Sequence, residues 1–179
     1  MELKATRYDI RGAVAVIFLA RPHRRNAWTG RMHTEYRFLL DKANKDRTVG
    51  AIIVSGEGDS FCVGGDSQAL QGHSARGSYD SGVSGDISVP GYGIDERFDA
   101  TFAYHYGLDK PIIAAINGAA AGVGLALAAF ADVRFSVPMA KLTTAHGKLN
   151  LPAEYGLSWI LPRLVGLGRA NDLLLTSRV

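Results

Sequence analysis

The sequence predicts an α/β fold in which helices cover a sheet. Three observations carry this prediction. Short runs of β-branched and apolar residues at 13–19, 51–54 and 112–116 are typical of buried strands. Between the first two runs, apolar residues from Trp28 to Ala43 recur every three to four positions, which indicates an amphipathic helix. Glycines gather where strands give way to helices, and the 179 residues suffice for one domain, 1–179, with its own core.

The remaining elements follow from local patterns. Asp66 is well placed to cap a short helix, and Lys110-Pro111 ends the helical spacing that precedes the third strand. We expect a helix over 66–71, an irregular surface loop over 71–93, a helix over 94–106, a small apolar helix over 125–131, strands over 132–136 and 140–145, and helices over 152–165 and 169–175.

Composition narrows the function classes. Hydrophobic residues make up 47% and charged residues 21%, as in ordinary globular proteins. Twenty Lys and Arg against seventeen Asp and Glu give a net charge of +3, too small an excess to predict a nucleic-acid partner. A single cysteine, Cys62, makes no internal disulfide, and no run approaches the ~20 apolar residues of a membrane span. We therefore expect a cytoplasmic protein with no membrane partner.

The sequence does not have the residue spacing of several common nucleotide-binding, hydrolase and metal sites. The glycines of 118–124 match neither G-x-G-x-x-G nor a P-loop, and residues 82–86 break the G-x-S-x-G elbow at the last position. The five histidines show no metal-ligand spacing, so we expect no metal. Because the nucleotide-binding motifs are also missing, we expect no separate cofactor. Cys62 lacks an identifiable orienting histidine, which favours a small buried residue over a nucleophile.

Two strand-to-helix turns remain, Val63-Gly64-Gly65-Asp66 and Ala121-Gly122-Val123-Gly124. Each can present a bare backbone N–H close to the beginning of a helix. Two such donors aimed at one point form an oxyanion hole, whereas glycines that only shape tight turns are the plainer interpretation.

Four motifs, in order, resemble those of one family. Residues 21–27 (RPHRRNA) resemble an early R-P-x-x-x-N-A element, and residues 60–66 (SFCVGGD) resemble an F-x-x-G-x-D loop. Residues 111–132 match a P-x-I-A-A-x-N-G-x-A-x-G-x-G helix and its following aspartate, and residues 158–166 (SWILPRLVG) match a late signature. The chain is thus identified as similar to the crotonase (enoyl-CoA hydratase/isomerase) superfamily, from Arg21 to Arg178.

The resemblance implies a fold, a substrate and two donors. The fold would be a spiral of repeated ββα units with helices covering the sheets, without the C-terminal helical region with which family members usually continue. The substrate would be an acyl-CoA thioester, coenzyme A being part of it, and the backbone N–H groups of Gly65 and Val123 would hold the enolate oxygen. Because family members usually assemble as trimers or hexamers, the resemblance also implies a homotrimer or hexamer. The positions implied near coenzyme A and the thioester are Arg24, Arg25, Val63, Gly64, Asp66 and Gly122.

Proton transfer separates members of the family. The two glutamates of the hydratases fall on Ala126 and His146, so the two-glutamate route is missing its carboxylates. Glu154 instead matches the single catalytic acid of the Δ3,Δ2-enoyl-CoA isomerases, and burial in an apolar pocket would suit it to shuttle a proton. A solvated glutamate is the alternative. His146 is a second catalytic candidate because histidine titrates near neutral pH, although a lone histidine is more often structural.

The sequence therefore favours an isomerase that uses Glu154 as a proton shuttle. Two alternatives remain within the same superfamily: enoyl-CoA hydratase activity in the broad sense, and acyl-CoA binding without catalysis. A nucleic-acid binder, suggested only by the arginine-rich turn 21–25, is the weakest interpretation.

Overall fold

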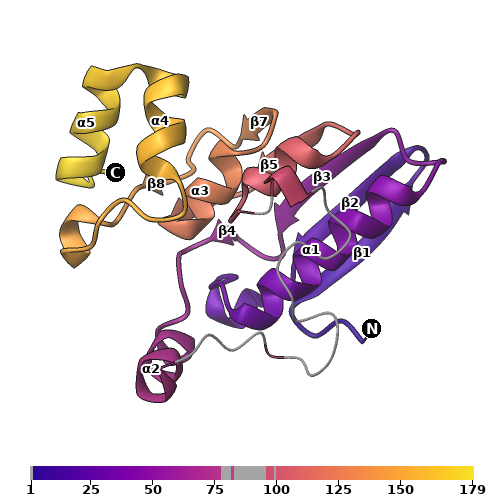
Figure 1. Ribbon diagram of the computed structural model, residues 1–179, viewed down its shortest axis with the longest axis horizontal. Helices are drawn as coiled ribbons and strands as arrows, with labels where there is room; N and C mark the ends of the chain where they lie inside the picture. The colour runs from indigo at the N-terminus through magenta and orange to yellow at the C-terminus, as the bar shows by residue number, and fades with distance from the viewer. Residues whose placement is uncertain (1, 78–81, 83–95, 99) are drawn as a thin grey trace.

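The computed structural model describes residues 2–77, 82, 96–98 and 100–179 and consists of four successive β-β-α units (Figure 1). The first two units contain β1 (Thr6–Arg11), β2 (Val14–Leu19), η1 (Pro22–Arg24) and α1 (Gly30–Lys45), then β3 (Ala51–Gly56), β4 (Ser60–Cys62) and α2 (Ser67–Arg76). Two 3₁₀ helices, η3 (Glu96–Phe98) and η4 (Ala103–Gly107), lead to the third unit of β5 (Ile112–Ile116), β6 (Ala119–Ala121) and α3 (Val123–Ala129). The fourth comprises β7 (Val133–Ser136), β8 (Leu142–Thr143), η5 (Gly147–Leu149) and α4 (Leu157–Val165), followed by α5 (Leu167–Thr176).

The strands form two sheets. The larger sheet has the order β1-β2-β3-β5-β7, with β1 antiparallel to β2 and the other pairs parallel. The smaller sheet has the parallel order β4-β6-β8. In each of the last three units the first strand joins the larger sheet and the second joins the smaller one. The loops that follow β4, β6 and β8 consequently leave the same edge of the smaller sheet.

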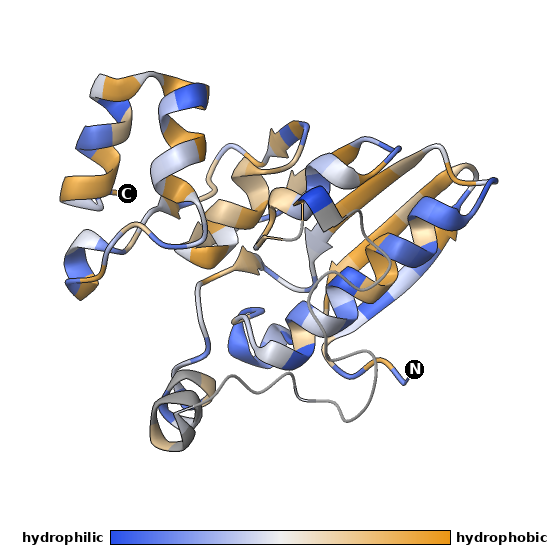
Figure 2. Ribbon diagram, in the orientation of Figure 1, coloured by the Kyte–Doolittle hydropathy of each residue, from blue (hydrophilic) through white to orange (hydrophobic). Residues whose placement is uncertain are grey.

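Helix α1 packs against β1 and β2 and covers one face of the larger sheet (Figure 1). The Thr29 hydroxyl caps it by accepting from the Met32 N–H, and its inward residues, including Tyr36, Leu39 and Leu40, are buried. Figure 2 shows the corresponding division, with hydrophilic residues on the outer side of the helix and hydrophobic strands beneath it. The apolar spacing of the sequence therefore marks the buried side of α1, as predicted.

A polar connection crosses the aromatic part of this core. The Tyr36 hydroxyl lies 3.0 Å from His105 Nε2, and His105 Nδ1 lies 3.2 Å from the Phe130 carbonyl oxygen. Because a carbonyl only accepts, Nδ1 carries the hydrogen and Tyr36 donates to Nε2. Burial lowers the pKa of His105 to about 4, so this histidine is neutral at pH 7.

The predicted strands and the first helix are confirmed. The runs at 13–19, 51–54 and 112–116 are β2, β3 and β5, and the expected strands at 132–136 and 140–145 contain β7 and β8. Three strands were not predicted. β4 and β6 have three residues each, too few to show a period, and β1 is an edge strand whose charged residues mask its alternation.

Several helix and loop boundaries differ from the predictions, and the helix expected over 169–175 is the longer α5. Helix α2 continues to Arg76, so the prediction of a loop over 71–93 is wrong at its beginning, while residues 78–81 and 83–93 lie outside the described residues. The expected helix over 94–106 contains 3₁₀ turns, with 94, 95 and 99 not described. Helix α4 begins at Leu157 instead of 152, because Tyr155 and Gly156 adopt left-handed φ angles of 55° and 75°. The apolar helix expected over 125–131 runs from Val123 to Ala129.

Candidate active site

Gly65 follows β4 and is fixed by the backbone of Trp28. The Trp28 N–H donates to the Gly64 carbonyl at 2.8 Å, and the Asp66 N–H donates to the Trp28 carbonyl at 2.8 Å, which forms a parallel bridge between Trp28 and Gly65. In such a bridge the N–H of the central residue faces away from its partner. The Gly65 N–H is therefore directed to the opposite side, where β6 lies beside β4.

Gly122 follows β6 and begins the second loop. Its φ of 50° and ψ of −117° suit only glycine, and they turn the chain directly into α3. A Cβ at Gly122 would lie 4.0 Å from the Gly64 Cα, so the two glycine loops are adjacent. Val123 is the first residue of α3, and its N–H precedes any intrahelical acceptor.

The packing of Gly124 sets how closely these loops approach each other. A Cβ on Gly124 would lie 2.1 Å from the Cys62 carbonyl oxygen and 2.8 Å from the Cys62 Cβ. Helix α3 therefore rests directly on the backbone of β4. Within the part of the chain that the structure describes, neither the Gly65 N–H nor the Val123 N–H donates to another protein group. Two unused donors thus lie on neighbouring loops.

His146 follows β8, the third strand of the smaller sheet. Its side chain is 4% exposed, and Nδ1 is buried without a hydrogen-bond partner among the described residues. Burial lowers the pKa of His146, and the negative charge of Glu154 opposes that shift, which places the two side chains within electrostatic reach. The neighbouring Thr144 carbonyl lies 3.8 Å from the position that a Cβ on Gly122 would occupy. This loop therefore adjoins the second glycine loop.

Glu154 lies in the turn before α4 and is exposed, so the described residues do not enclose it in the apolar pocket that would suit a proton shuttle. Its neighbour Tyr155 turns inward instead, with its ring 6.1 Å from that of Phe102. Burial, followed by the charge of Glu154, raises the pKa of Tyr155. No local pattern marks Tyr155, because its inward position depends on a left-handed backbone that the sequence indicates only through the following Gly156.

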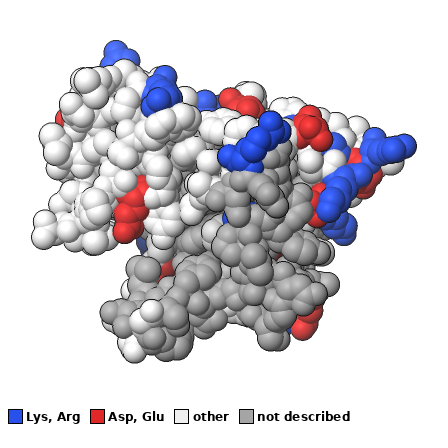
Figure 3. Space-filling view, in the orientation of Figure 1, with Lys and Arg blue, Asp and Glu red and all other residues white. Residues whose placement is uncertain are grey.

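The arginine-rich turn lies against the first glycine loop. The Val63 N–H donates to the Arg25 carbonyl at 3.3 Å, and Arg24 Nη2 lies 3.4 Å from an Asp66 oxygen. Burial alone would raise the pKa of Asp66, but its hydrogen bond from Arg21 and two from backbone N–H groups hold that pKa below the usual value. The structure thus brings Arg24 and Arg25 together with the loop 63–66. Figure 3 shows basic side chains beside acidic ones on the face in view.

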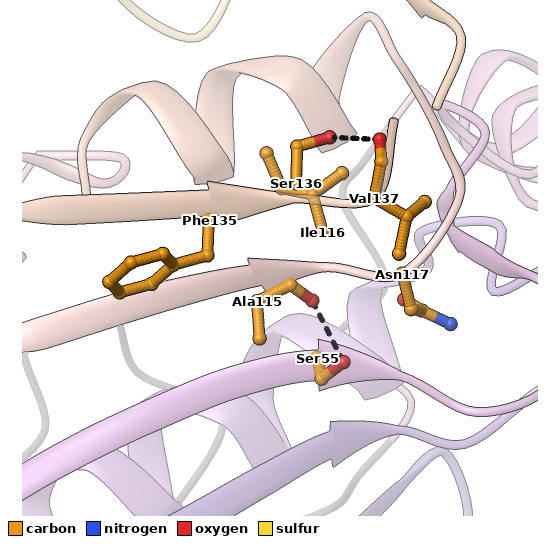
Figure 4. Close-up of a pocket in the computed structure, with 7 residues that line it drawn as sticks. All are labelled: Ser55, Ala115, Ile116, Asn117, Phe135, Ser136 and Val137. Carbon is orange, nitrogen blue, oxygen red and sulfur yellow. Dashed lines mark hydrogen bonds between the residues drawn. The ribbon is translucent and has the colours of Figure 1, made fainter. Parts of the chain in front are cut away.

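A separate groove of about 270 Å³ lies at the carboxyl ends of β3, β5 and β7 (Figure 4). Its serine hydroxyls are already used, since Ser55 donates to the Ala115 carbonyl at 2.8 Å and Ser136 to the Val137 carbonyl at 3.1 Å. The groove contains none of the predicted site residues. Its lining consists of Ser55, Ala115, Ile116, Asn117, Phe135, Ser136 and Val137.

Neither a metal cluster nor a membrane helix occurs in the described parts of the chain. No three His, Cys, Asp or Glu side chains described in the structure lie close enough to hold a metal ion. No helix in the same residues has the length and apolar character to span a bilayer.

Comparison with known proteins shows the family of the chain. Residues 9–179 match the family model described as enoyl-CoA hydratase/isomerase. The chain belongs to the enoyl-CoA hydratase/isomerase family. The crotonase-type α/β fold that the resemblance implied is thereby confirmed. A structure of an enoyl-CoA hydratase from Bacillus anthracis shares 27% identity at a TM-score of 0.81, covering 98% of this chain and 64% of that one.

Two relatives in the family carry different names. A probable enoyl-CoA hydratase of Mycobacterium tuberculosis is 38% identical over 162 residues, which is 90% of this chain and 58% of that protein. The 1,2-epoxyphenylacetyl-CoA isomerase of Escherichia coli is 32% identical over the same shares of the two chains. The chain therefore spans about 60% of the length of these hydratase/isomerase family members.

Proposed function

We propose that the protein is an enzyme that acts on an acyl-CoA thioester and stabilises the enolate of its carbonyl group. The proposal rests on one observation: the N–H groups of Gly65 and Val123 lie on adjacent loops, and neither donates to a described protein group. A developing oxyanion between them would accept both hydrogen bonds without reorganisation of the backbone. Removing one such donor typically lowers kcat by roughly 100- to 1000-fold.

The proposed reaction is double-bond isomerisation, with Glu154 as the proton shuttle. A carboxylate would remove the proton on the α-carbon, the electron pair would spread over the dienolate, and the same carboxyl group would return the proton at the γ-carbon. One base suffices for this sequence, and Ala126 supplies none at the first hydratase position. The electrostatic reach between Glu154 and His146 supports a place for the carboxylate beside the three converging loops.

The experiment compares two substrates. The full-length gene product is incubated with a 3-enoyl-CoA and separately with a 2-enoyl-CoA, and the absorbance of the conjugated thioester is followed. Isomerisation predicts a gain of absorbance from the 3-enoyl ester that disappears in Glu154→Gln and persists in Glu2→Gln, a control at an exposed carboxylate. Unchanged turnover in Glu154→Gln would remove the shuttle role.

Hydration is a second candidate because of His146. The buried Nδ1 has no partner among the described residues, and the lowered pKa keeps the ring neutral and able to accept a proton from water at pH 7. Hydration predicts a loss of absorbance from the 2-enoyl ester, weaker in His146→Gln and at acidic pH, where the ring gains a proton. Saturable binding with no conversion of either ester would favour a non-catalytic acyl-CoA-binding protein.

The remaining roles concern coenzyme A and assembly. Arg24 and Arg25 are proposed to contact its phosphates, so replacing either with Ala should raise KM more than it lowers kcat. Val63, Gly64, Asp66 and Gly122 are proposed to shape the surface around the thioester. A homotrimer or hexamer and a cytoplasmic location stay predictions, which light scattering of the purified protein and cell fractionation test.

A further inference from the structure

The direction of the Gly65 N–H depends on the residues on either side of it. Gly64 has a φ of 114°, and two consecutive glycines give this loop little stiffness of its own. The Trp28 bridge supplies two backbone hydrogen bonds, one to Gly64 and one from Asp66. The contacts that hold Trp28 and Asp66 in register therefore also set the direction of the Gly65 N–H.

The Asp66 carboxylate is the most heavily bonded group at this point. Its side chain is 3% exposed. Oδ2 accepts from Arg21 Nη2 at 3.0 Å, and Oδ1 is 3.4 Å from Arg24 Nη2. Oδ1 also accepts from the N–H groups of Gln68 and Ala69 at 3.0 and 3.3 Å, which caps α2. One carboxylate thus joins the arginine-rich turn to the beginning of α2.

Arg21 closes the connection on the opposite side of the bridge. Its Nη1 donates to the Ala27 carbonyl at 2.6 Å while Nη2 holds Asp66. Its backbone N–H donates to Asn26 Oδ1 at 2.9 Å, so the turn that carries the guanidinium is itself fixed. The guanidinium therefore ties the residue before Trp28 to the residue after Gly65.

We propose that Asp66, paired with Arg21, is a positioning residue that aims the Gly65 N–H into the oxyanion hole. This inference rests on the donor role of Gly65 in the proposed function and adds the ion pair that maintains it. Asp66 acts through Gly65 and has no part in proton transfer. An Asp66→Asn substitution would remove the ion pair but keep the cap of α2, because asparagine is as good an N-cap as aspartate.

The test uses Asp66→Asn and Arg21→Lys in the full-length protein. Asparagine keeps the acceptor for the α2 cap and loses the charge, and lysine keeps the charge and loses the two-pronged geometry. We expect kcat to fall about tenfold in each variant with KM within about twofold, since a displaced donor weakens the transition state more than ground-state binding. The double variant should lose little more than either single one.

A second readout does not require turnover. Amide hydrogen exchange of the Trp28 and Asp66 N–H groups, which form the bridge, should quicken in both variants, and unchanged exchange there overturns the proposal. The control is Asp172→Asn, which breaks an Arg–Asp pair with Arg178 on α5 and should leave kcat and this exchange unchanged. Wild-type kcat in Asp66→Asn overturns the positioning role alone. Absence of turnover on any thioester by the wild-type protein removes the proposed function and this role together.

Discussion

Replacing Gly124 with alanine tests the close contact between the two glycine loops. The substitution lies inside α3, where helix propensity alone favours alanine over glycine by about 0.5–1 kcal/mol. The structure predicts the opposite sign. The new Cβ would lie 2.1 Å from the Cys62 carbonyl oxygen, 2.8 Å from its Cβ and 2.9 Å from its carbonyl carbon, and none of these atoms belongs to a flexible side-chain end.

The backbone of β4 must therefore move away from α3. Overpacking of this kind costs about 1–3 kcal/mol and exceeds the propensity gain. Because β4 leads to Gly65 and α3 begins at Val123, the same movement should separate the two donors and lower kcat. The stability change is larger than the error of a careful denaturant titration, which makes its sign measurable.

The assay is urea unfolding, followed for Gly124→Ala and for Gly168→Ala as the matched control. Gly168 is also helical, in α5, and a Cβ there would meet nothing within 4 Å, so alanine should stabilise it by up to about 1 kcal/mol. The midpoint should fall for the first variant and rise for the second. A rise for both would refute the close contact between α3 and β4.

Three further predictions follow from buried groups. Burial lowers the pKa of His33 and His105 to about 4, below the unfolded value, so both rings are neutral in the folded protein at pH 7. The free energy of unfolding, measured with urea, should therefore fall by about 2 kcal/mol per histidine as the pH is lowered to 5, and an unchanged value would contradict the burial of these rings. Asn26→Ala should destabilise by about 2–4 kcal/mol in urea, because the buried amide bonds three backbone groups at a φ of 56°. Gly122→Ala has space but an unsuitable φ of 50°, so steady-state kinetics should show a lower kcat, and a wild-type kcat would contradict the strain.

Local patterns predicted the elements whose buried side chains recur at regular positions within one stretch of sequence. The spacing from Trp28 to Ala43 marks α1, and the apolar runs mark β2, β3 and β5, because each of these elements buries a regular set of side chains. β4 and β6 lack that signal because each has only three residues. They form strands by pairing with each other, as Ser60 does with Ala119, which lies 59 positions later in the sequence.

The sequence likewise predicted some features of the candidate site and not others. The glycine loops and their motif resemblance selected Gly65 and Val123 as candidates, but the bridge to Trp28 and the approach of Gly122 to Gly64 are long-range contacts that no local pattern reveals. Glu154 was chosen by position in a motif, and motif position says nothing about burial. The left-handed Tyr155 turns inward and leaves the preceding carboxylate exposed.

The oxyanion hole is tested most directly by the infrared spectrum of a bound acyl-CoA labelled with ¹³C at the thioester carbonyl. Two N–H donors at that oxygen polarise the bond before any reaction occurs. An oxyanion hole formed by Gly65 and Val123 predicts that the carbonyl stretch moves to lower frequency on binding and moves less far in Asp66→Asn. A bound thioester whose carbonyl frequency equals that of the ester in water would contradict an oxyanion hole formed by Gly65 and Val123.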